Sequence, residues 1–273
     1  FPDSYLLSQE YSLAKLTENK NPFPEITAVE RIDFECERRG GITIHGRISL
    51  PINHKKGTRV PAIFWTYPSE YTSEEEYKNS LIRGLRGHKY NGFSHLSYLR
   101  WSDIWLTQGY AIVYPDIPII GKGNLYNENY IAHLIDSMYA AIRKVDEMGY
   151  IDIDRIGHGG HSYGAFATAN YLTHTPFFKA SIAGDGAYNR TLTPMTFQYE
   201  KRFLWEAQSS YLEMPPFFYA DHIDTPLLMY HGAQDNNTGT FLIQPECLMQ
   251  VLAGLGKKLY TTSTPLNHTD PVV

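Results

Sequence analysis

The sequence contains few cysteines and no long apolar run, and each of these features excludes a class of protein. Its two cysteines, Cys36 and Cys247, make neither a disulfide framework nor a thiolate metal site. No window approaches the ~20 uninterrupted apolar residues of a membrane-spanning helix. The 11 histidines include no H-E-x-x-H pattern and no paired spacing. We therefore expect no membrane association, no metal and no cofactor.

Positive charge is also scarce. The 24 lysines and arginines against 29 aspartates and glutamates give a formal net charge of −5, and no basic stripe is visible, which argues against a nucleic-acid partner. With 42% hydrophobic and 19% charged residues, the 273-residue chain is typical of one large soluble domain. It opens with Phe1 rather than Met, which we interpret as a trimmed or incomplete N-terminus. A periplasmic, secreted or cytoplasmic location and the oligomeric state all stay open.

Strand patterns alternate with helix patterns along most of the chain. Residues 1–29 end in N-P-F-P and are predicted to be a linker, leaving residues 30–273 as one domain. The acidic run 74–76 is predicted to start a solvated helix, and residues 117–121 a loop. Strands are expected at 32–38, 42–50, 60–65, 110–114, 155–161, 179–183, 227–230 and 258–262, and helices at 96–106, 127–148, after 162 and at 241–255. This alternation predicts an α/β fold, with a mostly parallel twisted sheet of about eight strands and helices on both faces.

The segment G-H-S-Y-G, residues 160–164, lies where a short strand turns abruptly into a helix of small residues. It matches G-x-S-x-G, the nucleophile elbow that exposes a serine hydroxyl on a strained turn. Only glycines let the following helix pack so close to the strand. The pattern alone is weak, because chance gives about one match in every ten chains of this length. A glycine-rich turn with an incidental serine is the alternative.

A serine nucleophile needs a base, and the base needs an orienting acid. In the α/β-hydrolase arrangement these follow in the order Ser, Asp or Glu, His, each after a strand. Here Ser162 is followed by Asp235 and by His268, the only histidine beyond Asp235. Taken singly, Asp235 could be an Asx-turn residue and His268 a solvated histidine. The ordered set predicts a triad.

The tetrahedral intermediate of such a reaction also needs hydrogen-bond donors for its oxyanion. The backbone N–H of Tyr163, the residue after the nucleophile, is one candidate. The second is expected from the loop after strand 60–65, where Tyr67 lies. Tyr67 as a packed aromatic residue is the alternative.

Several of these motifs together resemble the prolyl oligopeptidase family of serine peptidases, in particular its glutamyl endopeptidase-like branch. They are G-G-H-S-Y-G-A-F at 159–166, W-T-Y-P-S-E-Y at 65–71, I-P-I-I-G at 117–121, G-A-Y-N-R-T-L-T-P at 186–194 and H-G-A-Q-D-N-N at 231–237. The resemblance implies an α/β-hydrolase domain that cleaves peptides, with Ser162, Asp235 and His268 as the triad and the Tyr67 hydroxyl in the oxyanion hole. Residues 1–29 look like the exit from an N-terminal propeller, so a catalytic fragment of a longer precursor is expected.

The sequence departs from the family pattern at three places. Gly157 and His158 stand where apolar strand residues are usual, and Asp185 introduces a carboxylate where an uncharged residue is expected. Only five residues follow His268, where the family continues with a helix. A serine peptidase is the favoured interpretation. An esterase on the same triad, or a hydrolase-fold module without turnover, are the alternatives.

A preference for acidic side chains would require a cation to bind the substrate carboxylate, ideally a bidentate arginine. Arg190, in the A-Y-N-R loop, is the first candidate, with Arg83 and Arg202 behind it. Structural ion pairs are the alternative role for these arginines, and repulsion by Asp185 would weaken the case for Arg190.

Overall fold

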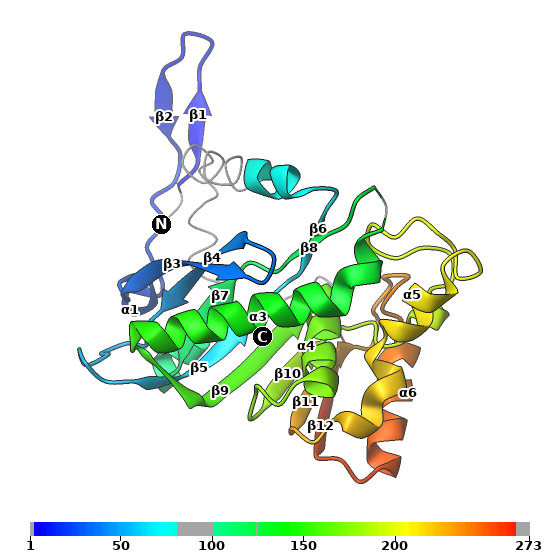
Figure 1. Cartoon of the computed structure of the whole chain (residues 1–273). Coiled ribbons are helices and arrows are strands. Elements are labelled where there is room, and N and C mark those ends of the chain that lie inside the picture. Colours follow the sequence, from blue (N-terminus) through cyan, green and yellow to red (C-terminus); the bar gives the residue numbers. More distant parts are fainter. Residues whose placement is uncertain (1–2, 81–100, 124, 266–273) are drawn as a thin grey trace.

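The computed structural model describes residues 3–80, 101–123 and 125–265 (Figure 1). An eight-stranded sheet runs through it in the order β12-β11-β10-β9-β5-β7-β4-β3. Its strands are β3 (Arg31–Arg38), β4 (Ile42–Ser49), β5 (Val60–Trp65), β7 (Ala111–Pro115), β9 (Ile151–His161), β10 (Ser181–Gly184), β11 (Leu227–Gly232) and β12 (Leu259–Thr264). The β3–β4 and β4–β7 pairs are antiparallel and the other neighbours are parallel. The predicted fold class is confirmed.

Helices cover both faces of this sheet. The helices of the described chain include α1 (Pro24–Thr27), α3 (Tyr130–Met148), α4 (Tyr163–His174), α5 (Gln208–Glu213) and α6 (Ile243–Gly254), with the 3-10 helices η2 (Trp101–Gln108), η3 (Tyr126–Asn129), η4 (Arg190–Leu192) and η5 (Pro216–His222). Side chains alternate along β5, so Ala62 and Phe64 join the core beneath α3 and α4 (Figure 1), whereas Ile63 joins a second core under α1 and η2. This two-sided burial explains why β5 is an uninterrupted apolar run.

Three local predictions can be compared with the structure. Residues 74–80 are helical, as the acidic run predicted, and the Glu76 carboxylate accepts hydrogen bonds from the backbone N–H and hydroxyl of Thr72. The helix expected at 96–106 is the 3-10 helix η2 from Trp101 onward, and residues 96–100 lie outside the described part. The loop prediction for 117–121 was wrong, since β8 (Pro118–Ile120) pairs in parallel with β6 (Ser69–Tyr71).

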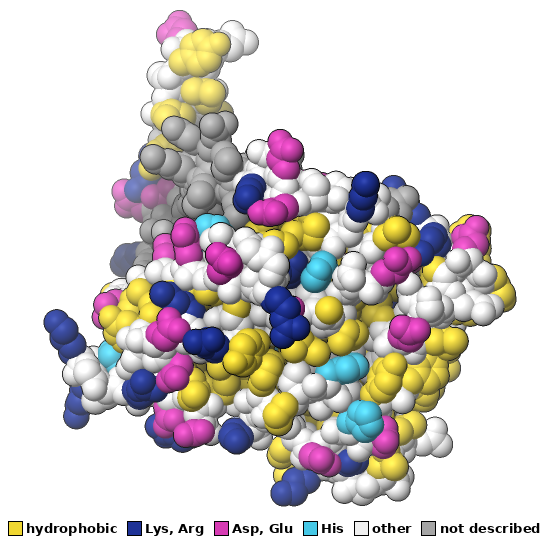
Figure 2. Space-filling view, in the orientation of Figure 1, with side chains coloured by type: hydrophobic (Ala, Val, Ile, Leu, Met, Phe, Trp, Pro, Cys, Tyr) yellow, Lys and Arg dark blue, Asp and Glu magenta, His cyan; other side chains and the backbone are white. Residues whose placement is uncertain are grey.

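The predicted linker contains an antiparallel hairpin of β1 (Tyr5–Leu7) and β2 (Leu13–Lys15), which projects from the body of the molecule (Figure 1). The space-filling view shows apolar side chains on this projection and a mixture of both charges over the body (Figure 2). Within the described ranges, no helix is both long and apolar enough to cross a membrane. The division into 1–29 and 30–273 stays a prediction.

Candidate active site

The turn at Ser162 joins the end of β9 to the start of α4 in a conformation that side chains rarely adopt. Ser162 has φ 56° and ψ −116°, and its N–H donates to the Gly184 carbonyl at 2.7 Å. A Cβ at Gly160 would lie 2.3 Å from the Gly164 oxygen, and one at Gly164 would lie 2.3 Å from the Thr66 oxygen. Both glycines of the motif are therefore required by close backbone approach rather than by turn propensity.

The two unusual residues of the elbow strand have structural explanations. The ring nitrogens of buried His158 lie 2.9 Å from the hydroxyls of Thr66 and Thr168, which links the end of β5 to α4. Burial lowers the pKa of His158 to about 3, so its ring stays neutral. A Cβ at Gly157 would lie 3.0 Å from the Ala180 oxygen of the segment before β10.

The two candidate oxyanion residues lie at the start of α4 and in the segment after β5. Tyr163 is the first residue of α4, where backbone N–H groups point out of the helix. Its buried side chain donates to the Glu70 carboxylate at 2.7 Å, which holds the ring away from solvent. Tyr67 is 53% exposed, and its ring lies edge-on to that of Tyr163 at 6.1 Å. The donor role of the Tyr67 hydroxyl stays a prediction.

Asp235 follows β11 and has a fully buried side chain. It accepts hydrogen bonds from the Asn237 N–H at 2.9 Å and the Thr240 hydroxyl at 2.8 Å. The N–H of Ala233, in the same loop, donates to the Thr264 carbonyl at the end of β12. This bond joins the Asp235 loop to the segment that leads towards His268. His268 itself lies outside the described residues, so the predicted triad stays a prediction.

Sequence reasoning singled out Asp185 but missed His231 and the contacts that join both residues to Asp235. Asp185, directly after β10, accepts from the Gly232 N–H at 2.7 Å and lies 3.4 Å from a ring nitrogen of His161. The His231 ring lies between Asp185 and Asp235. Asp185, His231 and Asp235 each have one potential ligand atom within 4.8 Å of those of the other two. Nε2 of His231 lies 2.7 Å from the Thr240 carbonyl oxygen, so Nδ1 is the ring nitrogen left for any ligand.

A pocket of about 460 Å³ opens beside Ser162. Arg190 lies in its wall, and Asp185 is not among the residues that line it. The Arg190 guanidinium carbon lies 4.3 Å from the ring centres of both Phe166 and Phe197. Burial lowers the pKa of Arg190, against the opposing effect of nearby tyrosines and Glu70. Among the described residues, its Nε has no hydrogen-bond partner.

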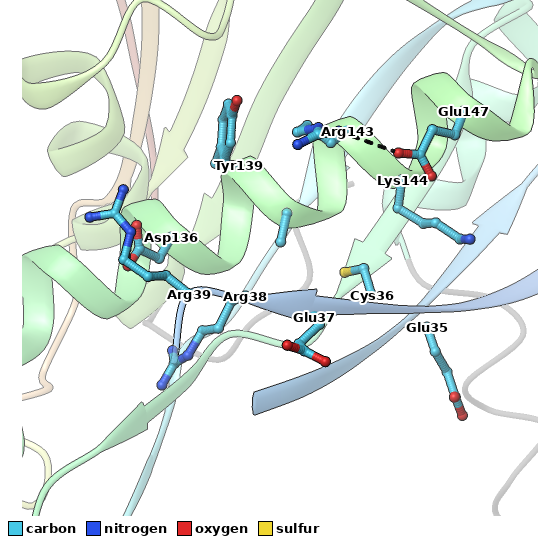
Figure 3. A pocket seen from close by; sticks show the side chains of 11 residues that line it. Glu35, Cys36, Glu37, Arg38, Arg39, Asp136, Tyr139, Arg143, Lys144 and Glu147 are labelled. Atoms are coloured by element: carbon cyan, nitrogen blue, oxygen red, sulfur yellow. Dashed lines mark ion pairs between the residues drawn. The ribbon is translucent and has the colours of Figure 1, made fainter. Parts of the chain in front are cut away.

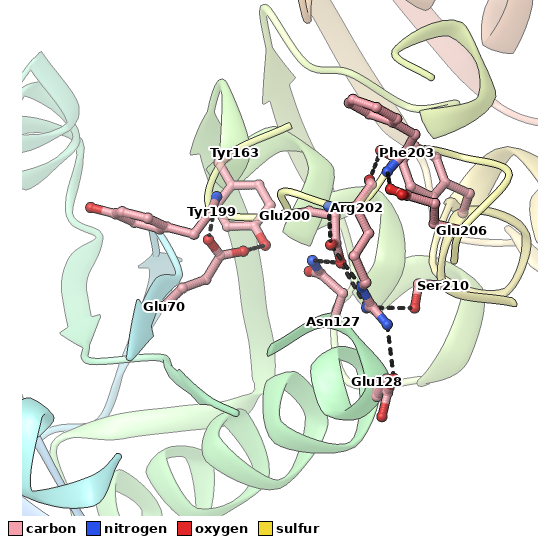
Figure 4. Close-up of polar contacts among 11 residues, drawn as sticks. Glu70, Asn127, Glu128, Tyr163, Tyr199, Glu200, Arg202, Phe203, Glu206 and Ser210 are labelled. Carbon is pink, nitrogen blue, oxygen red and sulfur yellow. Dashed lines mark hydrogen bonds and ion pairs between the residues drawn. The ribbon is translucent and has the colours of Figure 1, made fainter. Parts of the chain in front are cut away.

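Arg202 has a different environment, shown in Figure 4. Its guanidinium donates to Glu200 at 2.9 Å and to Glu128 at 3.0 Å. Burial opposes ionisation of Glu200, but hydrogen bonds from Arg202 and Asn127 outweigh it and hold the pKa of Glu200 below its ordinary value. Arg202 does not line the pocket, so the structural alternative applies to it. Arg83 lies outside the described residues.

A second hollow, of about 510 Å³, lies between β3 and α3 (Figure 3). Charged side chains of both signs line it, including Glu37 of β3, Arg39 directly after β3 and Lys144 of α3. None of the predicted site residues lines it, and its charges do not converge on one point in Figure 3. The pocket beside Ser162 is therefore the candidate site.

Comparisons with known proteins agree with this geometry. The profile of the prolyl oligopeptidase family matches residues 96–266. The chain is 38% identical over 258 residues to the probable chloroplastic glutamyl endopeptidase of Arabidopsis thaliana, covering 93% of this chain and 26% of that protein. It is 28% identical over 250 residues to dipeptidyl-peptidase 5 of Porphyromonas gingivalis, covering 81% of this chain and 32% of that protein. The chain thus spans about a quarter to a third of the length of these relatives.

The chain resembles solved structures more closely in fold than in sequence. Dipeptidyl peptidase 4 of Porphyromonas gingivalis matches with a TM-score of 0.69 and 17% identity, over 90% of this chain and 33% of that one. Acylaminoacyl peptidase of Pyrococcus horikoshii matches with a TM-score of 0.63 and 20% identity, over 88% of this chain and 38% of that one. At these identities the likeness supports the fold.

The close packing of Gly164 at the elbow can be tested by adding one methyl group to this residue. Gly164→Ala places a Cβ against the Thr66 carbonyl, and we expect it to lower the free energy of unfolding by about 1–3 kcal/mol. Gly254→Ala is the matched control, because its Cβ would meet no atom within 4 Å. Urea unfolding followed by circular dichroism measures both. Equal stability of the two variants would contradict the packing account.

The pairing of Arg202 predicts a structural role. Arg202→Ala leaves the buried Glu200 carboxylate without its cation, and we expect a loss of about 2–4 kcal/mol in unfolding free energy. Because the Glu200 pKa lies below its ordinary value in the folded state, the stability it contributes is present at neutral pH and is lost as falling pH protonates it. The difference from wild type should therefore shrink in acid.

Arg143→Ala, which removes an exposed ion pair with Glu147, is the control and should change stability by less than about 1 kcal/mol. If Arg202→Ala lowered the unfolding free energy at neutral pH by as little as Arg143→Ala does, the structural role of Arg202 would be contradicted.

Proposed function

The chain belongs to the prolyl oligopeptidase family of serine peptidases, and from this we propose that it cleaves peptide bonds through an acyl-enzyme formed on Ser162. The observation that carries the proposal is the turn at Ser162, a non-glycine residue at φ 56°. Such strain persists only where the surroundings enforce it, and it is concentrated at functional sites. The adjoining pocket gives a substrate side chain a place to bind.

The proposed reaction assigns one role to each residue. His268 takes the proton from the Ser162 hydroxyl as the oxygen attacks the scissile carbonyl carbon, and Asp235 orients His268. The Tyr163 N–H and the Tyr67 hydroxyl stabilise the oxyanion of the tetrahedral intermediate. His268 then returns the proton to the leaving amine, and water, deprotonated by His268, hydrolyses the acyl-enzyme.

We further propose that the enzyme prefers an acidic side chain before the cleaved bond, with Arg190 as the residue that binds it. A buried cation is costly unless an anion compensates it. Arg190 packs against aromatic rings, and among the described residues Glu70 is the carboxylate that favours its charged form without making a salt bridge with it. A glutamate side chain entering the pocket would supply that anion. Two relatives carry the name probable glutamyl endopeptidase, which is consistent with this preference.

An esterase on the same triad is the principal alternative, and a hydrolase-fold module without turnover is the second. A cation beside the nucleophile favours substrates with an anionic group over simple neutral esters. A panel of matched peptide and ester substrates distinguishes the first two functions, and failure of the folded chain to turn over any of them would favour the third.

The proposed reaction is tested by incubating the chain with a peptide library and identifying the products by mass spectrometry. We expect cleavage after glutamate above other residues. Ser162→Ala should lower the rate by about 10⁴-fold or more, because Ser162 forms the covalent intermediate. Equal cleavage by wild type and Ser162→Ala would refute the mechanism, and cleavage of esters alone would refute the peptidase assignment.

The role of Arg190 is tested by Arg190→Met, which keeps an unbranched apolar side chain between Phe166 and Phe197. We expect the ratio of kcat/KM for Glu over Gln substrates to fall roughly 30-fold or more, since the substrate carboxylate loses a buried charged partner. Cleavage after Gln should change little. Arg143→Met is the exposed control. If Arg190→Met leaves the Glu-over-Gln ratio unchanged, Arg190 does not bind the acidic side chain.

A further inference from the structure

Gln244, the second residue of α6, is buried and contacts two loops that line the pocket beside Ser162. The first is the Arg190 loop, residues 187–193, and the second is the Asp235 loop, residues 233–240. From these two loops the pocket is lined by Ala187, Arg190, Leu192, Thr193, Asn237, Thr238, Gly239 and Thr240. A buried amide is costly unless its donors and its acceptor are paired. The partners of Gln244 therefore show which parts of the chain it holds together.

The amide of Gln244 makes four hydrogen bonds, all of them to backbone groups. Its oxygen accepts from the N–H of Tyr188 at 2.9 Å and from the N–H of Asn189 at 2.8 Å. Its nitrogen donates to the carbonyl of Asn189 at 3.1 Å and to the carbonyl of Gly239 at 3.3 Å. Since a backbone N–H can only donate and a carbonyl can only accept, these partners fix which end of the amide is the oxygen. Both hydrogens and both lone pairs of the amide are used.

Three of the four bonds hold the backbone directly before Arg190. The Arg190 loop also has bonds of its own, because the side chain of Asn189 accepts from the N–H and hydroxyl of Thr191. These internal bonds shape the turn of η4, but they do not connect it to the rest of the molecule. Gln244 makes such a connection, since it belongs to α6.

The fourth bond reaches the loop that carries the predicted catalytic acid. Gly239 accepts it, and the next residue, Thr240, donates its hydroxyl to the Asp235 carboxylate at 2.8 Å. The Thr240 N–H donates to the Asn237 carbonyl at 3.0 Å, so the Asp235 loop also has bonds of its own. One side chain thus joins the residues next to Arg190 to the residue next to Thr240.

We infer that Gln244 is a positioning residue that fixes the Arg190 loop against the Asp235 loop, so that an acidic side chain bound at Arg190 places its peptide bond at Ser162. This inference rests on the proposed function, which assigns the acidic side chain to Arg190. Gln244 is not among the residues that line the pocket, so it acts through the two loops. Small displacements of a binding group cost much of the rate that correct orientation gives. Ser162 is held separately, by the Gly184 carbonyl and the close approach of Gly164 to Thr66.

The role of Gln244 is tested by Gln244→Met, which keeps an unbranched side chain and removes all four hydrogen bonds. We expect the ratio of kcat/KM for Glu over Gln substrates to fall about tenfold or more, because Arg190 is displaced. The rate at which a small fluorophosphonate without an acidic group labels Ser162 should stay within about threefold of wild type. Gln250→Met is the matched control, because Gln250 is an exposed glutamine of the same helix, and it should change neither quantity.

Two results would overturn the inference. One is an unchanged Glu-over-Gln ratio in Gln244→Met, and the other is a labelling rate that falls as far as the ratio, which indicates general loss of structure. Arg190→Met separates this inference from the proposed function. If Arg190→Met lowers the ratio and Gln244→Met does not, the inference alone fails. If neither variant lowers it, the proposed acidic preference fails and the inference fails with it.

Hydrogen exchange followed by NMR provides a second measurement, which needs no turnover. The amides of Tyr188 and Asn189 should be protected in the unaltered chain and should exchange about tenfold faster or more in Gln244→Met, but not in Gln250→Met. Unprotected amides at these two residues in the unaltered chain would overturn the inference even if Gln244→Met failed to fold. A chain that shows the expected exchange but cleaves no peptide would refute the proposed function and leave the connection between the two loops standing.

Discussion

The strained turn at Ser162 is the constraint on which the rest of the site depends. A non-glycine residue at φ 56° costs about 1–3 kcal/mol. It persists because the neighbouring strands enforce it. The Gly184 carbonyl at the end of β10 accepts the Ser162 N–H, and Gly164 lies directly against the Thr66 carbonyl at the end of β5. One turn therefore fixes Ser162 relative to β5, which Tyr67 follows, and to β10, which Asp185 follows.

The two arginines differ in what balances their positive charge, and this difference separates a structural role from a proposed substrate-binding role. Arg202 is held by two glutamates, and these ion pairs account for its position without a substrate. Arg190 is surrounded by aromatic rings and lies in the wall of the pocket beside Ser162, so a substrate anion can complete its environment. Asp185, His231 and Asp235 form a second buried polar group, in which the His231 ring lies near both carboxylates. Because the protein interior has a low dielectric constant, removing one charged or polar group from either arrangement leaves its partners poorly compensated.

Much of the framework could be predicted from the sequence, because buried strands such as β5 are local apolar runs and G-x-S-x-G marks a local steric requirement. The pairing of β6 with β8 could not, since each strand has only three residues and its partner lies about fifty positions away. The same limit applies to side-chain partners. Nothing near Arg202 in sequence indicates Glu128, and nothing near Asp185 indicates the Gly232 N–H. Asp235 was assigned by its position after a strand, and the neighbours that hold it, Thr240 and His231, became visible only in three dimensions. The roles of His268 and Tyr67 stay predictions.

The central claim is that the elbow presents Ser162 as an activated nucleophile. The most direct measurement is reaction of the folded chain with a fluorophosphonate, followed by intact-mass analysis and peptide mapping of the adduct. The account predicts one phosphonyl group per chain, attached to Ser162, and no adduct after denaturation, when the turn and its base are lost. A folded chain that stays unlabelled, or that is labelled at another residue, would contradict it.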